Sequence, residues 1–258
     1  MQASLRDSLR GDEMVLCLAL LNSRTPDVPA IAAACGYDAV YVDLEHTATS
    51  LETAGMLCSS ALGAGIAGLV RVPSQDPGFI ARALDVGASG VIVPHVDSVD
   101  EARAVVAAAR FPPAGRRSIS GPNALSGYAQ RPPDELTAVL DSRTVVAVMV
   151  ESTAAVADID AIAAVVGVDM VLVGPSDLTA EMGIHGDYEN EHFHNAVKCI
   201  AAACRNHGVA LGVAGIKSLD LLKGFVDLGL RFISAGTDIG MMSEAATMRA
   251  QALRALGG

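Results

Sequence analysis

Six ionisable side chains each follow an apolar, strand-like segment of the chain: Asp43, Glu45, His46, Arg71, Glu151 and Asp177. Carboxylates are ligands for hard divalent cations, an imidazole transfers protons near neutral pH, and a guanidinium stabilises an oxyanion. If these side chains meet at one place, they supply a metal site, a base and a cation. Taken singly, each is better interpreted as structural: Arg71 as a salt-bridge partner, Glu151 as a first-turn helix acid, and His46 as a loop histidine.

The junction Val171–Thr179 (VLVGPSDLT) runs from an apolar strand through a Gly-Pro turn into a short helix predicted to begin at or near Ser176. The backbone N–H groups of Ser176 and Asp177 would point outward, where the positive end of the helix dipole favours a carboxylate or phosphate. Asp177 also offers an oxygen ligand to a divalent cation. The alternative is a simple helix cap, which is favoured for this stretch in isolation.

Eight apolar segments alternate with segments of helical spacing, which predicts an α/β fold in which the whole chain, residues 1–258, forms a single (β/α)8 TIM barrel. Barrel enzymes carry their catalytic groups at the carboxyl ends of the strands, so the six ionisable residues should converge on one face. The predicted strands lie near 14–20, 38–43, 67–72, 90–95, 145–150, 169–174, 209–214 and 231–235.

One interval, residues 111–144, interrupts this alternation and is rich in Pro, Gly and Ser. A connection of this length in a barrel is usually functional or carries an extra helix, predicted here over 133–140. The interval is expected either to cover the barrel mouth or to make a subunit contact.

Composition excludes several classes of partner. A net charge of −11 provides no basic field for nucleic acid, and no segment reads as a leader or a membrane span. The five cysteines form no CxxC pair, which indicates reduced, buried thiols and a cytoplasmic location.

Six short motifs follow one another in order over about residues 10–255: Asp43-Leu44-Glu45-His46, Val70-Arg71-Val72-Pro73, Leu84-Asp85-Val86-Gly87 leading to Pro94, Phe111-Pro112-Pro113-Ala114-Gly115-Arg116-Arg117-Ser118, Val150-Glu151, and Gly174-Pro175-Ser176-Asp177-Leu178. Each is short, but the ordered set resembles the HpcH/HpaI family of class II pyruvate aldolases. The resemblance implies metal-dependent cleavage of 4-hydroxy-2-oxo acids to pyruvate, or a related 2-oxo acid, and an aldehyde, together with the reverse addition.

The resemblance also implies roles for the site residues. Glu151 and Asp177 are the expected ligands of Mg²⁺, Mn²⁺ or Co²⁺, a Lewis acid for the 2-keto oxygen. Arg71 is expected to bind substrate and to stabilise the charge that develops on that oxygen. The substrate carboxylate is expected on the turn formed by Gly174, Ser176 and Asp177.

His46 is expected to take the proton of the C4 hydroxyl, directly or through a metal-bound water. A catalytic imidazole needs a carboxylate to orient it, and two candidates remain open. Asp43 lies in the same loop, whereas the resemblance assigns this support to Asp85. On the predicted boundaries Asp85 precedes the fourth strand, at the end of the barrel away from the mouth, and it also fits a turn residue after a helix. Glu45 is interpreted as structural support.

The resemblance further implies a hexamer built as a dimer of trimers. The final helix, predicted over 245–256, carries Met248, Ala252 and Leu256 along one apolar face and is expected to be exchanged with a neighbouring barrel. The chain lacks the Trp that some family members place after the first strand, and Met149 stands where some have Gln, so the identity of the aldehyde stays open.

Two alternative functions remain. One is a metal-dependent lyase or decarboxylase that uses the same enolate chemistry, and the other is a ligand-binding barrel without turnover. Among signals outside the motifs, the GxGxxG match at 63–68 is interpreted as a helix-to-strand turn. His95 either lines the mouth or packs in the core, and Asp238 either caps the last helix or serves a neighbouring subunit.

Overall fold

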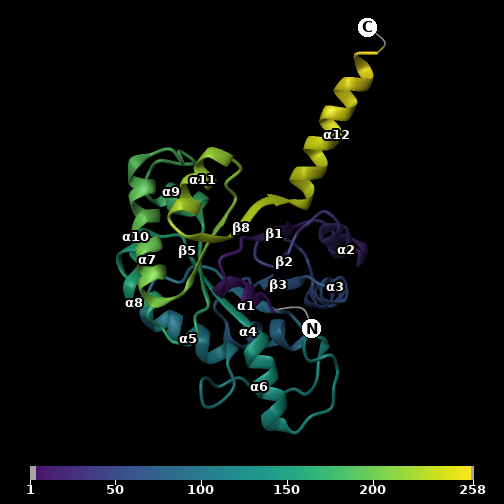
Figure 1. Ribbon diagram of the computed structural model, residues 1–258, viewed down its shortest axis with the longest axis vertical. Helices are drawn as coiled ribbons and strands as arrows, with labels where there is room; N and C mark the ends of the chain where they lie inside the picture. The colour runs from purple at the N-terminus through teal and green to yellow at the C-terminus, as the bar shows by residue number, and fades with distance from the viewer. Residues whose placement is uncertain (1–3, 257–258) are drawn as a thin grey trace.

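Eight parallel strands pair in chain order, and the last pairs back with the first to close a barrel (Figure 1). The computed structural model describes residues 4–256. Each strand lies within two residues of its predicted segment, which confirms the (β/α)8 TIM-barrel fold. The strands are β1 Val15–Leu20, β2 Ala39–Asp43, β3 Ala67–Arg71, β4 Gly90–Val93, β5 Val145–Val150, β6 Met170–Val173, β7 Ala210–Ala214 and β8 Leu230–Thr237.

Alternate strand residues face opposite sides of the barrel wall, because successive side chains of a strand point in opposite directions. The inner cluster takes Ala39 and Tyr41 from β2 and Leu69 from β3, whereas Val40 and Val42 face the helices. Two residues beyond Tyr41 on β2 and two beyond Leu69 on β3, the next inward-facing residues are Asp43 and Arg71. On β5 the inward-facing residue Met149 is followed, two residues later, by Glu151. The barrel interior therefore leads directly into the ionisable residues.

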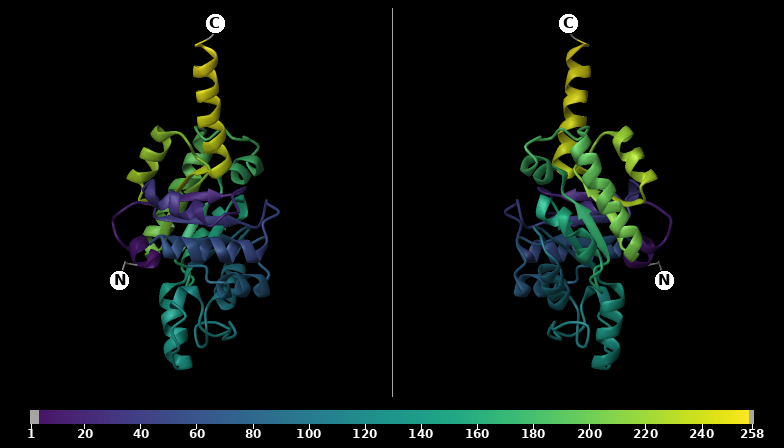
Figure 2. Two further views of the ribbon diagram at one scale, coloured as in Figure 1. Left: turned by 90° about the vertical axis from the view of Figure 1, so that its right-hand side faces the viewer. Right: turned by 90° about the vertical axis from the view of Figure 1, so that its left-hand side faces the viewer.

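Helices surround the strands and bury the outward-facing strand residues in a second, larger cluster (Figure 2). Side chains of Ser50, Asp76, Ser98, Ser152 and Ser218 accept hydrogen bonds from the first turns of five of these helices. The surrounding helices are α2 Asp27–Ala34, α3 Leu51–Gly63, α4 Pro77–Asp85, α5 Val99–Ala109, α7 Thr153–Ala157, α8 Ile159–Ala163, α9 Pro175–Glu181, α10 Glu191–His207 and α11 Leu219–Asp227.

A short helix, α1 (Leu5–Arg10), closes the amino-terminal end of the barrel, with Leu5 and Leu9 buried in the inner cluster. Next to it Asp169, which directly precedes β6, pairs with Arg6 at 2.7 Å and with Arg110 at 2.5 Å. These ionic contacts lie at the end of the barrel opposite to the strand carboxyl ends.

The segment 111–144 contains a 3-10 turn, η1 (Ala124–Ser126), and the helix α6 (Pro133–Arg143), which confirms the helix predicted over 133–140. The segment connects the end of α5 to the start of β5, so it lies at the amino-terminal end of the barrel, at the bottom of Figure 1. The alternative that it covers the mouth of its own barrel is therefore wrong.

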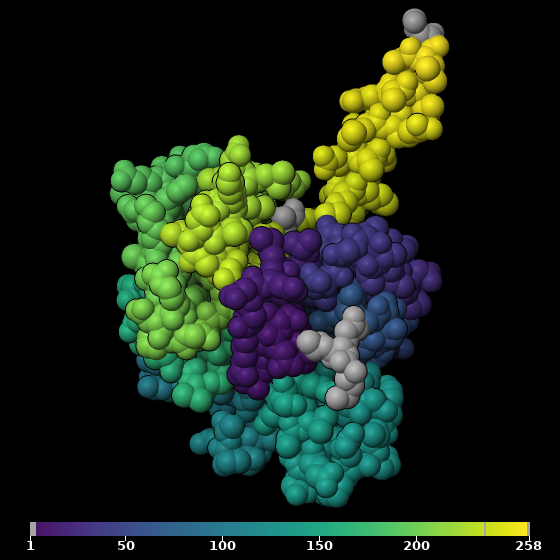
Figure 3. All heavy atoms as spheres, viewed as in Figure 1, coloured from purple at the N-terminus to yellow at the C-terminus, as the bar shows by residue number. Residues whose placement is uncertain are grey.

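The last helix, α12 (Asp238–Arg254), begins well before the predicted Ala245 and projects away from the barrel (Figures 1 and 3). None of its residues is buried, whereas α10, of the same length, buries seven. Met242, Met248 and Leu253 are among its exposed apolar side chains.

Three smaller expectations can be compared with the structure. The turn at 63–68 leads from α3 into β3 with Gly65 at φ +82°, which confirms a helix-to-strand turn.

All five cysteines are free, but Cys35 and Cys199 are exposed, so the expectation of buried thiols is wrong for these two. Within residues 4–256, no helix combines the length and the hydropathy that crossing a bilayer requires.

Candidate active site

An ion pair between Arg71 and Asp43 is the best-defined feature of the barrel mouth. The two residues are register partners on β3 and β2. Arg71 Nε and Nη2 donate to Asp43 Oδ1 and Oδ2 at 2.9 and 2.7 Å, a bidentate arrangement. Burial lowers the pKa of Arg71, but the bond to Asp43 and the charges of Asp43 and Glu45 raise it by more. The guanidinium is thus a fixed cation at the mouth.

Asp43 also organises the loop that follows β2. Its Oδ1 accepts the backbone N–H groups of Glu45 and His46 at 3.0 and 3.4 Å, and its carbonyl accepts Thr47 Oγ1. Asp43 was one of two candidates for orienting the His46 imidazole. The structure shows it holding the backbone of His46 and the guanidinium of Arg71 instead.

Glu45 is the central carboxylate of the mouth rather than a peripheral support. Its Oε2 lies 3.2 Å from Arg71 Nη1 and 3.6 Å from His46 Nε2, while its Oε1 lies 3.1 Å from His95 Nε2. Of the three carboxylates Asp43, Glu45 and Asp85, Glu45 is the one that contacts the His46 ring.

His95 connects Glu45 to Glu151. Its Nδ1 and its backbone N–H lie 3.0 and 2.8 Å from Glu151 Oε1. Its side chain is exposed, so His95 lines the barrel mouth and does not pack in the core. Its φ of +54° is unusual for a residue with a Cβ and costs about 1–2 kcal/mol. The next residue, Val96, is buried and its backbone N–H donates to the carbonyl of Met149, which fixes the chain on that side of His95.

Glu151 is buried, and burial raises the pKa of its carboxyl group. The hydrogen bond and charge of His95 lower this pKa, while the charges of Glu45 and Asp177 raise it, so Glu151 is repelled by two other carboxylates. A cation placed among them would offset that repulsion.

Gly174 and α9 form the facing side of the mouth. Gly174 is the N-cap residue of α9, which begins at Pro175 and places exposed Ser176 and Asp177 in its first turn. A Cβ on Gly174 would lie 2.6 Å from Glu151 Oε2 and 2.9 Å from Glu151 Cβ, so a larger residue here would displace the Glu151 side chain. The close approach sets Glu151 against the turn that carries Asp177.

The donor set of Glu151 and Asp177 fits a hard divalent cation, which binds carboxylate oxygens and retains waters. Among residues 4–256, no group of three His, Cys, Asp or Glu side chains forms a ready-made ligand set. A cation held by only two protein carboxylates would keep coordination positions free for substrate oxygens and water.

Asp85 lies apart from this group. It ends α4, and its carboxylate pairs with Arg117 Nη2 at 2.7 Å, while its carbonyl accepts from Asn123. Both partners belong to the segment before β5, so Asp85 occupies the amino-terminal end of its own barrel, opposite His46. Within this chain the structure does not bring Asp85 to His46, because helix α4 and strand β4 separate the two ends.

Asp238 holds the loop after β1, a role that sequence reasoning missed. Its carboxylate accepts the backbone N–H groups of Leu21, Asn22 and Ser23 at 3.0, 3.0 and 2.6 Å, which fixes the loop after β1. Arg24 of that loop donates to Thr49 at 2.6 Å, next to the His46 loop. Its position directly after β8 was the signal that it belongs to the mouth.

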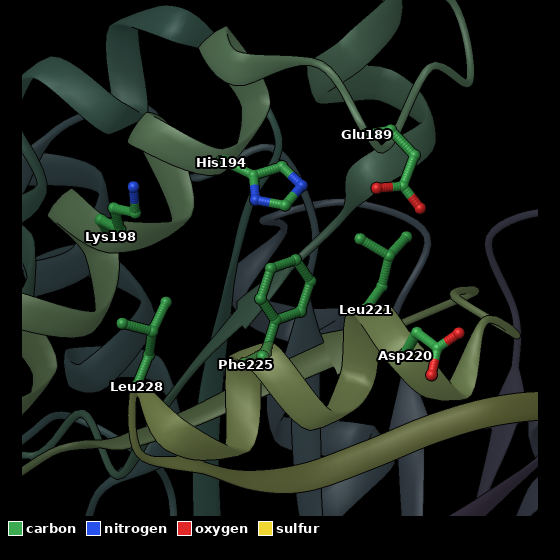
Figure 4. Close-up of a pocket in the computed structure, with 8 residues that line it drawn as sticks. Glu189, His194, Lys198, Asp220, Leu221, Phe225 and Leu228 are labelled. Atoms are coloured by element: carbon green, nitrogen blue, oxygen red, sulfur yellow. The ribbon is translucent and has the colours of Figure 1, made fainter.

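A groove of about 350 Å³ lies elsewhere, in the helical layer between α10 and α11 (Figure 4). His194 stacks edge-on against Phe225 there, with ring centroids 5.9 Å apart, and Lys198 and Asp220 stand at its edges. These residues belong to the outer helices, whereas the strand carboxyl ends carry the ionisable cluster. The groove is therefore separate from the candidate active site.

The fold and this cluster define a (β/α)8-barrel enzyme whose site combines acidic groups, an imidazole and a fixed guanidinium at the strand carboxyl ends. Residues 17–245 match the HpcH/HpaI aldolase/citrate lyase family, and the chain belongs to that family. It is a carbon–carbon lyase of the aldolase type.

Individual relatives agree. The chain is 39% identical to a 4-hydroxy-4-methyl-2-oxoglutarate aldolase of Hapsidospora irregularis over 84% of this chain and 82% of the relative. It is 31% identical to a 5-keto-4-deoxy-D-glucarate aldolase of Klebsiella pneumoniae over 92% and 90%. The crystal structure of an HpcH/HpaI aldolase from Desulfitobacterium hafniense superimposes with a TM-score of 0.91 at 28% identity, covering 98% of this chain and 97% of that one.

Proposed function

We propose that this aldolase cleaves 4-hydroxy-2-oxo acids to pyruvate, or a related 2-oxo acid, and an aldehyde, and catalyses the reverse addition. The observation that carries the proposal is the Arg71 guanidinium, held at the mouth by Asp43 and Glu45. Glu45 is connected through His95 to Glu151, whose carboxyl group also feels the charge of Asp177. A fixed cation and a two-carboxylate cation site in one barrel mouth are what enolate chemistry requires.

Glu151 and Asp177 would hold the divalent cation, Mg²⁺, Mn²⁺ or Co²⁺. When bound, the cation supplies Lewis acidity for the 2-keto oxygen. The free N–H groups in the first turn of α9, at Ser176 and Asp177 beside Gly174, would receive the substrate carboxylate.

Arg71 contributes charge stabilisation that is already in place before reaction. Cleavage of the C3–C4 bond moves an electron pair toward the 2-keto oxygen, and a guanidinium locked by a bidentate carboxylate meets that charge without reorganising. Asp43 and Glu45 act on the reaction through Arg71.

His46 is the proposed acceptor of the C4 hydroxyl proton. Its imidazole is exposed at the mouth, so it can reach a bound substrate, and its Nε2 faces Glu45. Glu45 therefore takes the orienting place that sequence analysis divided between Asp43 and Asp85.

We also propose a homo-hexamer, a dimer of trimers, in which α12 is exchanged with a neighbour, and a cytoplasmic location. The projecting α12 with its exposed apolar residues supports the exchange, and the outward residue Leu16 of β1 is partly uncovered, as expected where an eighth barrel helix is displaced. Five free thiols agree with a reducing compartment.

The test is pyruvate release from 4-hydroxy-4-methyl-2-oxoglutarate and 5-keto-4-deoxy-D-glucarate, before and after treatment with EDTA, with Mg²⁺, Mn²⁺ and Co²⁺ added back. We expect release that EDTA abolishes and a divalent cation restores. Release that survives exhaustive chelation would contradict the assigned cation site. Decarboxylation of oxaloacetate without any aldol cleavage would favour the alternative decarboxylase.

A further inference from the structure

One residue of the mouth, His95, contacts both halves of the site and has no role in the function proposed above. One half consists of Asp43 and Arg71, at the ends of β2 and β3, and of Glu45 in the loop after β2. The other consists of Glu151 after β5 and the Gly174 turn after β6. His95, between them after β4, places Nε2 3.1 Å from Glu45 Oε1 and Nδ1 3.0 Å from Glu151 Oε1.

The left-handed backbone of His95 makes this double contact possible. At φ +54° the residue directs its backbone N–H and its ring Nδ1 at the same oxygen, Glu151 Oε1, at 2.8 and 3.0 Å. The side-chain amide of Gln75 donates to the carbonyl of His95 and so holds the turn from the other side. A strained conformation kept by such contacts is typical of a functional position.

The contacts of His95 with Oε1 leave the other carboxylate oxygen of Glu151, Oε2, available to a ligand. With Oε1 engaged by His95, Oε2 lies against Gly174, where an added Cβ would come within 2.6 Å. No residue in the described range 4–256 donates a hydrogen bond to Oε2. This oxygen is thus presented toward the turn that carries Asp177, the second expected cation ligand.

We infer that His95 is a positioning residue that sets the rotamer of Glu151, so that Oε2 faces Asp177 and the pair is preorganised for a divalent cation. The inference rests on the proposed function, to which it adds the group that orients the cation site. The bond to Glu45 ties this orientation to Arg71, so the cation site and the guanidinium keep a fixed relation.

Two variants of His95 and one control distinguish the contribution of the imidazole ring from that of the backbone conformation. His95→Gly adopts a positive φ without strain and keeps the N–H donor but loses the ring. His95→Asn tolerates the left-handed region and keeps one side-chain donor toward Glu151. Tyr128→Gly is the matched control, because Tyr128 also has a positive φ, of +55°, but lies in the segment before β5, at the opposite end of the barrel.

The measurements are Mn²⁺ affinity by calorimetry, the melting temperature without metal, and kcat for pyruvate release at saturating Mn²⁺. For His95→Gly we expect Mn²⁺ to bind about 10- to 100-fold more weakly, as for lost partners of metal ligands. The metal-free melting temperature should change little, because the backbone strain that glycine relieves opposes the loss of the ring contacts. The kcat should return to within about threefold at saturating Mn²⁺, because a positioning role is overcome by mass action. His95→Asn should recover most of the affinity, and Tyr128→Gly should bind Mn²⁺ normally.

Several outcomes would overturn the inference. Unchanged Mn²⁺ affinity in His95→Gly would show that Glu151 needs no ring to orient it, and a kcat that stays low at saturating Mn²⁺ would make His95 a catalytic residue instead. An unaltered protein that binds no Mn²⁺ would overturn both this inference and the proposed cation. An unaltered protein that binds Mn²⁺ but releases no pyruvate would contradict the proposed reaction alone, and the affinities of the variants would still decide the role of His95.

Discussion

Arg71 and His46 stand close together but differ in how the protein holds them. Arg71 has a mostly buried side chain that donates to two carboxylates, whereas the His46 ring is 61% exposed and faces one oxygen at 3.6 Å. A rigidly held cation suits charge that appears at one fixed atom, while an exposed imidazole suits proton transfer with a substrate that enters and leaves. The two residues should therefore fail in different ways when replaced.

The first prediction separates them by reaction. Arg71→Ala should slow aldol cleavage and oxaloacetate decarboxylation alike, by about 10²–10³-fold, because both reactions develop charge on the 2-keto oxygen. His46→Ala should slow aldol cleavage by about 10²–10⁴-fold but affect decarboxylation much less, since only the aldol substrate has a C4 hydroxyl. Steady-state kinetics with both substrates measures the contrast.

Arg71→Lys is the control for charge. Lysine keeps the positive charge but cannot make the bidentate bond to Asp43, so it should recover only part of the rate. If Arg71→Ala and His46→Ala reduce both reactions by the same factor, the division of roles is wrong.

At the scale of single residues, the sequence placed part of the cluster at the barrel mouth but did not predict which side chains bond to one another. Asp43, Arg71 and Glu151 follow from the inward alternation of their strands, which a closed barrel extends to the mouth. The contacts of Glu45 and the positive φ of His95 depend on rotamers and on neighbours distant in the chain, which no local pattern encodes. The position of Asp85 before β4 indicated the amino-terminal end of the barrel, away from the mouth, and the structure shows it there.

Among the elements, the loop after β1 is held by the start of α12. Asp238 accepts three backbone N–H groups of this loop and one from Ile239 of its own helix. Burial raises the pKa of Asp238, but the hydrogen bonds from Ser23, Leu21 and Asn22 lower it by more. The carboxylate thus remains an acceptor over the whole neutral range.

The second prediction follows from this lowered pKa. Asp238→Asn should destabilise the protein at pH 7 by about 1 kcal/mol, because solvent screens charge-assisted hydrogen bonds to a half-exposed carboxylate. Because the folded pKa lies below the ordinary 3.8, the stabilisation is complete above pH 3.8 and is lost as the pH falls through the folded pKa. The melting temperatures of the two proteins should therefore converge in acid.

Asp100→Asn is the matched control, because Asp100 is also a first-turn acid but is exposed, and its ion pair is with Arg103 of the same helix. Its effect should stay below about 0.5 kcal/mol. A difference between Asp238→Asn and the unaltered protein that persists undiminished in acid would contradict the role of the charge.

The opposite end of the barrel is held by charge as well as by apolar packing. Asp169 pairs with Arg6 of α1 and with Arg110 after α5, and it accepts the backbone N–H of Val146 at the start of β5. Burial lowers the pKa of Arg110, although Asp169 raises it. One carboxylate therefore joins three elements that are distant in sequence.

The third prediction is that Asp169→Asn destabilises the protein by about 3–5 kcal/mol, because a buried guanidinium loses its anion. Urea unfolding measures this loss. The kcat/KM of the folded variant should stay within about twofold of normal, since the strand carboxyl ends are not touched. Asp160→Asn, which breaks the exposed pair with His207, should cost less than about 1 kcal/mol. A folded, stable Asp169→Asn with low activity would contradict this separation of stability from catalysis.

At the scale of the whole molecule, the residue pattern predicted the barrel, whereas the expectation that the last helix leaves it came from the family resemblance alone. The helical spacing after β8 predicted a helix, and a short apolar run predicted each strand. Whether that helix lies against its own barrel or leaves it depends on which apolar surface covers it. In the structure α12 leaves it, since none of its residues is buried (Figure 2).

The fourth prediction concerns what covers this helix. An exposed helix that carries Met242, Met248 and Leu253 is unfavourable for an isolated chain, because so much apolar surface stays in water. Docking on a neighbouring barrel would remove it, as the proposed hexamer requires. Met248→Glu places a charge in that contact and should shift the protein toward smaller species, whereas Thr247→Glu, about 100° around the helix, should not. Light scattering measures the mass, with 26.4 kDa expected for one chain. A fully active monomer of the unaltered protein would show that α12 needs no partner.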